Sequence, residues 1–69
     1  MITIAELRAR NNKMSQQELA DEIGVGVQSI RRWEKDIYSA KSEYIVRLSK
    51  YFNVSSDSLL GVSNKNFSA

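Results

Sequence analysis

Basic and amide side chains recur on one side of a short segment, residues 27–35 (VQSIRRWEK). In a helix that turns about 100° per residue, one arc of about 140° contains Val27, Gln28, Arg31, Arg32 and Lys35. Ser29, Ile30 and Trp33 fall on the opposite side. Gln pairs with adenine and Arg with guanine through two hydrogen bonds, and a Val methyl can contact a thymine methyl. The spacing therefore predicts a helix with one buried side and one side that can read base edges.

A solvated surface is the competing interpretation of this basic side, because most runs of charge on helices simply face water. The net charge of +2 adds little weight to a nucleic-acid partner. Trp33, the only Trp, is expected in the core because its helical phase matches that of Ile30.

Catalysis and metal binding have almost no support in the composition. The chain has no His and no Cys, which excludes the usual zinc sites and any disulfide framework. Ser15 is expected to cap a helix, since no His or Cys is present to activate a hydroxyl nucleophile. We therefore expect no enzyme activity, no metal and no cofactor.

The length of 69 residues predicts one small domain with one core. With no Pro, three Gly and 42% hydrophobic residues, the composition favours an all-α fold with short turns. No segment approaches the roughly 18 apolar residues of a membrane span, and the N-terminus does not resemble a signal peptide. A cytoplasmic protein is the expectation.

Capping signals and apolar periodicity mark five helices. Thr3 with Glu6, and Ser15 with Glu18, form the T/S-x-x-E pattern of a capping box, and Gly24 is suited to end the second helix. Asn53 and Gly61 are the expected ends of the fourth and fifth. The expected helices span residues 4–12, 16–23, 27–35, 42–52 and 56–60, within a domain of residues 1–61 followed by a flexible tail, 62–69.

A three-residue turn containing two Gly (residues 24–26) joins the second expected helix to the basic one. Two helices joined in this way are typical of the helix-turn-helix, whose second helix enters the major groove of DNA. This arrangement favours base reading over a merely solvated surface.

Residues 15–34, SQQELADEIGVGVQSIRRWE, closely resemble the helix-turn-helix of the phage repressor and Cro family, also called the Xre family. The resemblance covers most of residues 3–61 and extends through Leu48, Phe52, Asn53, Val54, Ser55, Leu59, Leu60 and Gly61. It implies a compact five-helix domain of the lambda-repressor type that binds double-stranded DNA.

The resemblance also implies roles for individual residues. Val27, Gln28 and Arg32 match positions that face bases. Positions that contact the DNA backbone match Gln16, Gly26, Arg31 and Lys35. The family often has Ser or Thr where Gly26 stands, so here the helix lacks a side-chain cap and the backbone contact is in question.

Five further positions concern the scaffold around the basic helix. An Arg of the first helix pairs in the family with the Glu matching Glu34, and both Arg8 and Arg10 lie one residue from the matching position. Asp36 stands where the family commonly has Gly, and Ala40 where it has Pro, so the following loop is expected to take a different path.

These observations predict a sequence-specific transcriptional regulator, of the Cro type or the N-terminal domain of a phage or prophage repressor. A homodimer would place two reading helices about 34 Å apart on a pseudo-palindromic operator. The alternative is an antitoxin or bridging module on the same fold, whose protein partner would bind the acidic second helix (Glu18, Asp21 and Glu22) and the tail from Val62. A helical bundle without nucleic-acid function is the third possibility.

Overall fold

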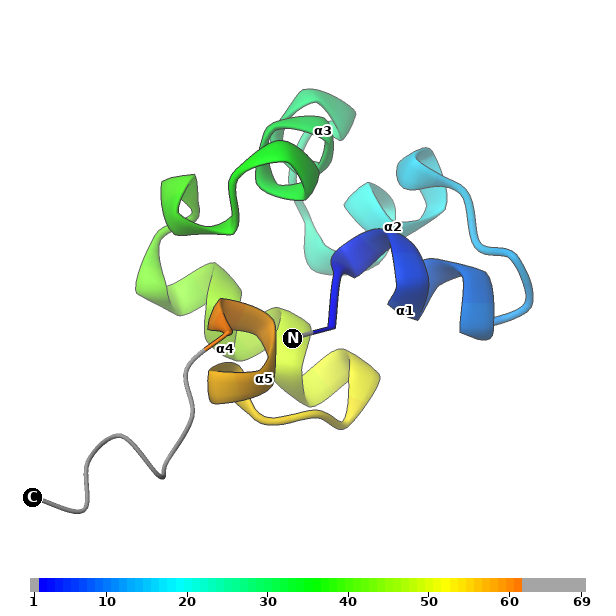
Figure 1. The fold of residues 1–69 in the computed structure, drawn as a ribbon. Helices are drawn as coiled ribbons and strands as arrows, with labels where there is room; N and C mark the ends of the chain where they lie inside the picture. The colour runs from blue at the N-terminus through cyan, green and yellow to red at the C-terminus, as the bar shows by residue number, and fades with distance from the viewer. Residues whose placement is uncertain (1, 62–69) are drawn as a thin grey trace, which may run out of the picture.

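The computed structural model describes residues 2–61, which contain five α-helices, one 3₁₀ helix and no strand (Figure 1). The all-α prediction is confirmed. The predicted tail, residues 62–69, lies outside the described residues. The elements are α1 (Ile4–Arg10), α2 (Gln16–Ile23), α3 (Val27–Lys35), η1 (Ile37–Ser39), α4 (Ser42–Phe52) and α5 (Ser56–Leu60).

The predicted starts of α1 and α2 are confirmed by their capping hydrogen bonds. The Thr3 hydroxyl accepts from the amide of Glu6 at 3.1 Å at the start of α1. At the start of α2 the box is complete: the Glu18 amide donates to Ser15 Oγ at 3.0 Å, and the Ser15 amide donates to Glu18 Oε1 at 2.9 Å. These bonds satisfy backbone donors that have no partner inside a helix.

Three predicted helix ends depend on left-handed backbone, and one of them is Gly61, which ends α5 at φ +72°. Gly24 ends α2 at φ +87°, and its amide donates to the carbonyl of Ala20 at 2.8 Å. Asn53 ends α4 at φ +56°, a conformation that Asn tolerates better than most residues with a side chain.

The first helix is shorter than predicted, since α1 ends at Arg10 and not at residue 12. The amide of Asn11 donates to the carbonyls of both Leu7 and Arg8 at 3.1 Å, which tightens the last turn. Asn12 and Lys13 then take φ values of +57° and +55°, which a helix cannot continue through.

The segment after α3 contains a short element that the sequence pattern did not predict. Asp36 Oδ1 accepts from the amide of Tyr38 at 3.1 Å and begins η1. Ile37 is only 7% exposed, so it belongs to the core. The Tyr38 hydroxyl donates to the carbonyl of Leu60, which connects η1 to α5.

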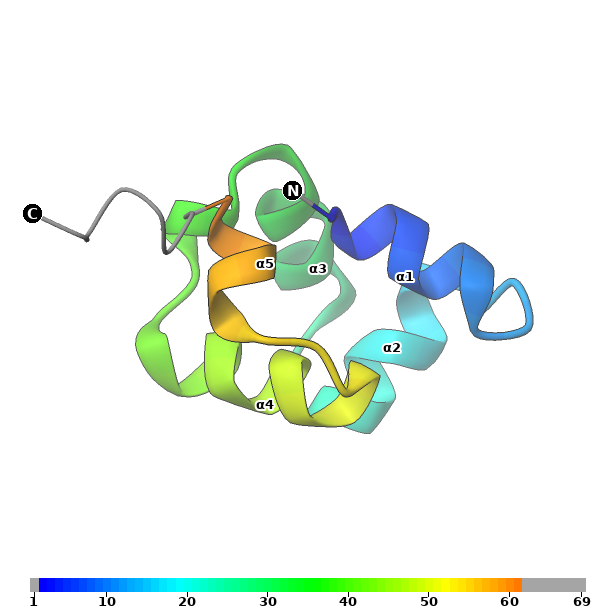
Figure 2. The ribbon, with the colours of Figure 1, turned by 60° about the horizontal axis from the view of Figure 1, so that its bottom comes forward.

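One hydrophobic core lies between the helices, and α5 closes it beside the N-terminal residues (Figures 1 and 2). The amide of Ile2 donates to the carbonyl of Ser58 at 3.2 Å across this contact. The core position predicted for Trp33 is confirmed, since it is 5% exposed. The buried apolar residues are Ile4, Leu7, Leu19, Ala20, Ile23, Ile30, Trp33, Ile37, Ile45, Leu48 and Leu59.

Candidate nucleic-acid interface

The two sides of α3 differ sharply in exposure. Ile30 is fully buried and Trp33 nearly so, which fixes the inner side of the helix against the core. Side chains on the outer side line one open hollow of about 350 Å³. Those lining it are Gln28, Arg31, Arg32 and Lys35, and all four are exposed. The predicted division of the helix into a core side and a basic side is therefore present.

Three of these outer side chains have all their polar atoms available. Among residues 2–61, no hydrogen bond or salt bridge involves the side chains of Gln28, Arg32 or Lys35. Val27 differs from them, because it is half-buried and packs partly against the core. Its exposed remainder is next to Gln28 at the start of the helix.

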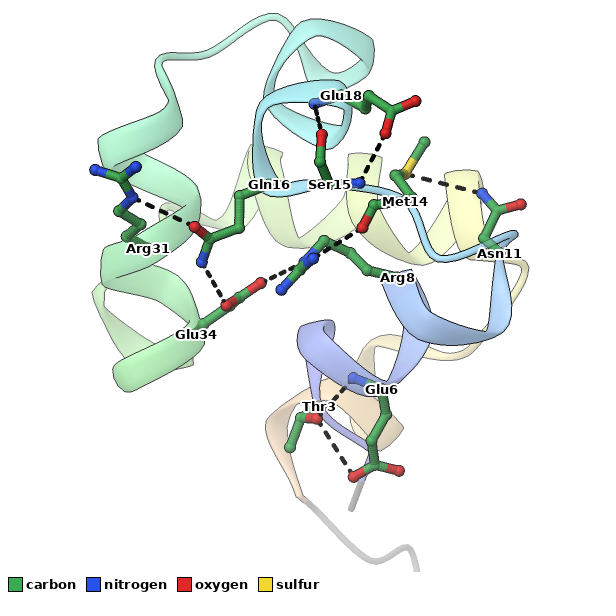
Figure 3. Close-up of polar contacts among 10 residues, drawn as sticks. All are labelled: Thr3, Glu6, Arg8, Asn11, Met14, Ser15, Gln16, Glu18, Arg31 and Glu34. Atoms are coloured by element: carbon green, nitrogen blue, oxygen red, sulfur yellow. Dashed lines mark hydrogen bonds and ion pairs between the residues drawn. The ribbon is translucent and has the colours of Figure 1, made fainter.

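The ion pair predicted at Glu34 is formed by Arg8. Arg8 Nε donates to Glu34 Oε2 at 2.6 Å, and Arg8 Nη1 donates to the carbonyl of Met14 at 2.8 Å (Figure 3). The side chains of the pair are only 18% and 14% exposed. Arg10, the other candidate, is exposed and takes no part in a salt bridge within residues 2–61, so its proposed role in this pair is wrong.

Gln16, the first residue of α2, bonds to two residues of α3. Its Nε2 donates to Glu34 Oε1 at 2.8 Å, and its Oε1 accepts from Arg31 Nε at 3.3 Å (Figure 3). Both oxygens of Glu34 are thus used, one by α1 and one by α2. The result is a chain of hydrogen bonds that fixes the start of α2 and the middle of α3 relative to α1.

The arrangement of α2, turn and α3 has a counterpart among known proteins. The model of a helix-turn-helix family matches residues 4–59, which is most of the chain. The chain belongs to this Xre-type helix-turn-helix family. It is therefore a DNA-binding transcription regulator of the Xre type, with α3 as the recognition helix. No curated protein and no solved structure matches the chain.

At the start of the recognition helix this Xre-type chain differs from the common pattern as its sequence predicted. Gly26 is the N-cap of α3 and offers no side-chain hydrogen bond. Its backbone is extended, with φ −76° and ψ 152°, and a Cβ atom built there would meet no atom within 4 Å. The missing side chain therefore leaves open space at the front of the recognition helix.

The acidic groups near this interface have partners inside the protein. Asp36 begins η1 through its hydrogen bond with Tyr38, so its carboxylate has a structural role beside the recognition helix. The backbone amide of Ser15 donates to Glu18, and this holds the pKa of the Glu18 carboxyl below its ordinary value of 4.5. Glu34 is neutralised by Arg8.

Sequence reasoning missed the two hydrogen bonds of the Gln16 amide. The resemblance had assigned Gln16 to the DNA backbone, and nothing in the local pattern indicates that Arg31 and Glu34 would reach it from α3. Its position at the start of α2 still allows the backbone contact, which stays a prediction.

Two further properties concern the described residues alone. None of the helices in residues 2–61 has the length and apolar character needed to cross a membrane. The same residues contain no cluster of three or more His, Cys, Asp or Glu side chains that could hold a metal ion.

Proposed function

We propose that this Xre-type regulator reads a pseudo-palindromic operator as a homodimer, in the manner of a phage or prophage repressor. The observation that carries the proposal is the exposure of Gln28 and Arg32 on α3 with no protein partner in residues 2–61. An amide and a guanidinium with free donors pair with purine edges in the major groove at no cost in broken protein contacts. Val27 would contribute only its exposed part, beside a thymine methyl.

The remaining basic and polar groups are assigned to the DNA backbone. Lys35 lies on the same side of α3 as Arg32 and is exposed, so it can neutralise a phosphate. Arg31 is directed toward the start of α2 by its bond to Gln16, where helix amides and the Gln16 side chain would approach a second phosphate. Gly26, at the start of α3, would contact the DNA backbone through its main chain only.

Selection from a randomised pool of duplexes, at near-physiological salt, tests the operator directly. We expect enrichment of a pseudo-palindrome whose half-sites are centred about 10 bp apart, one turn of the DNA helix. An enriched single half-site would contradict the dimer, and binding without any enriched sequence would contradict base reading. Repeating the titration at several protein concentrations separates cooperative pairing from two independent events.

Substitutions on α3 then assign the contacts. Gln28→Ala and Arg32→Ala should each cost about 1–3 kcal/mol on the selected operator and relax the preference at one base position. Lys35→Ala is the matched control, because it should weaken binding to every duplex alike. Equal losses on operator and random DNA for Gln28→Ala or Arg32→Ala would contradict their assignment to bases.

The alternative of a protein-binding module gains no support from the acidic side of α2. The carboxylate of Glu18 accepts from its own N-cap, and Asp21 Oδ1 accepts from Gln17 Nε2 at 3.0 Å. Two of the three acidic groups therefore have roles within α2 itself, and these two require no partner.

A further inference from the structure

A side chain of α4 contacts the end of α2, just before the turn that leads into the recognition helix. Arg47 Nη1 donates to the carbonyl of Ile23 at 3.1 Å, across 24 positions in the sequence. Ile23 is the last residue of α2, and Gly24 to Gly26 follow it directly. The contact therefore lies five residues before Gln28, the first polar side chain of α3.

A positive charge at the end of α2 stabilises this helix. A helix C-terminus carries unpaired carbonyls and partial negative charge. The last turn of α2 contains no basic residue of its own, whereas Asp21 and Glu22 both lie in it. The guanidinium of Arg47 supplies the missing positive charge and pairs one of the free carbonyls.

The same guanidinium also contacts the inner side of the recognition helix through one aromatic ring. Arg47 Cζ lies 5.4 Å from the ring centroid of Tyr44, a distance within the range of a cation–π contact. Tyr44 in turn stacks on Trp33 with centroids 5.3 Å apart and an interplanar angle of 31°. Trp33 is buried on the side of α3 away from the basic hollow.

Arg47 thus contacts both helices of the helix-turn-helix, α2 directly and the buried side of α3 through Tyr44. One contact holds the end of α2, and the other runs through Tyr44 to the back of α3. The turn between the two helices has backbone bonds to Ala20 on the α2 side, but on the α3 side Gly26 has no side chain to cap the helix. A small rotation of this turn would move Val27 and Gln28 relative to the base edges.

We propose that Arg47 is a positioning residue for base recognition: it sets the angle between α2 and α3 and so the placement of Gln28. The proposal rests on the base-reading function proposed above. Arg47 is itself exposed, and it acts on α3 through Tyr44 and the buried Trp33 and not through the reading side of the helix. Its removal should therefore reduce discrimination between operator and random DNA more than it reduces binding to DNA in general.

Three variants separate this role from charge and from bulk stability. Arg47→Met keeps the length of the apolar stem beside Tyr44 and removes both the charge and the hydrogen bond to Ile23. Arg47→Lys keeps the charge and one donor that can reach the carbonyl. Lys50→Met removes the same charge one turn further along α4, from an exposed side chain with no hydrogen bond in residues 2–61.

Operator and random-duplex affinities are measured for each variant at one salt concentration. We expect Arg47→Met to bind the selected operator about fivefold more weakly than Lys50→Met does, a loss typical of residues that act through a second element. The two should bind random duplex equally, because each has lost one positive charge. Arg47→Lys should recover part of the lost discrimination.

Two measurements without DNA test the mechanism itself. The amides of Gly24 and Val25 both donate to the carbonyl of Ala20, so their hydrogen exchange reports opening of the turn. Exchange should be faster in Arg47→Met than in Lys50→Met. The fluorescence of Trp33, the only Trp, should change in Arg47→Met alone, since Tyr44 joins it to Arg47.

The outcomes are distinguishable. Equal operator affinity of Arg47→Met and Lys50→Met, or unchanged exchange at Gly24 and Val25, would overturn the proposal for Arg47 and leave base reading intact. If the wild-type chain selects no operator, the proposal of base reading by α3 is wrong. The proposal for Arg47 is then wrong too, even if hydrogen exchange at Gly24 and Val25 is faster in Arg47→Met.

Discussion

Replacing Gly26 by Ser should make the protein more stable. Gly26 already has the extended backbone of an N-cap, φ −76° and ψ 152°, which Ser adopts without strain. An added Cβ would meet no atom within 4 Å. The Ser hydroxyl could accept from the amide of Ser29, which now bonds only to the carbonyl of residue 26 at 3.0 Å.

The expected gain is small. A Ser cap in place of Gly is worth a few tenths of a kcal/mol as a net change, which already includes the lower conformational entropy of the unfolded chain once Gly is removed. A gain of about 0.3–0.5 kcal/mol raises the Tm of a domain of this size by about 1–4 °C.

Gly24→Ser is the matched control, two residues away in the same turn. Gly24 has φ +87°, where any side chain is strained although the nearest atom to its Cβ, Arg47 Nη1, is 3.9 Å away. This variant should lose roughly 1 kcal/mol for the left-handed backbone. Thermal and urea unfolding of the two variants, followed by the circular dichroism of the helices, gives both values.

A lower stability of Gly26→Ser would refute the reasoning, because neither strain nor a clash is available to explain it. So would equal effects of Ser at positions 24 and 26, since the two Gly would then not differ in backbone requirement. Operator binding supplies a second check: a Ser at the front of α3 has room for a phosphate contact, so affinity should not fall.

Three further predictions concern single side chains. Arg8→Met should cost about 2–3 kcal/mol in urea unfolding, because it leaves the Glu34 carboxylate short of its charged donor, whereas Arg10→Met should change stability by less than about 0.5 kcal/mol. Glu18→Gln should be less stable than wild type above about pH 4.5 and equally stable in stronger acid, because a lowered folded-state pKa gives stability that is lost as pH falls through it; a difference that grows toward acid would contradict this sign. Lys35→Ala should reduce the salt dependence of binding by about one unit of slope, and an unchanged slope would exclude a phosphate contact.

Local sequence signals predicted most of the fold because the relevant interactions lie within four residues of each other. The capping box at Ser15 and the left-handed ends at Gly24 and Asn53 need no distant partner, and all three are present. The inner and outer sides of α3 followed from helical phase, and burial of Trp33 agrees with them.

What the sequence could not provide is the set of contacts between segments far apart in the chain. Arg8 and Arg10 both lie in α1, and which of them reaches Glu34 depends on how α1 packs against α3. The 3₁₀ helix η1 has too few residues for any periodicity, so buried Ile37 was not recognised.

The bonds of the Arg47 and Gln16 side chains to other helices span 15 to 24 positions and likewise required three-dimensional information.

The residues of the recognition helix fall into two groups. One group holds the helix in the fold and cannot be substituted without loss of structure, whereas the other can be substituted freely. Glu34, Ile30 and Trp33 hold the helix in place, and a change in any of them disturbs α1 or α2. Gln28, Arg32 and Lys35 bond to nothing in residues 2–61, so their replacement disturbs no neighbour. A library randomised at these three positions alone would consist largely of folded proteins, and it offers a short route to regulators with new operators.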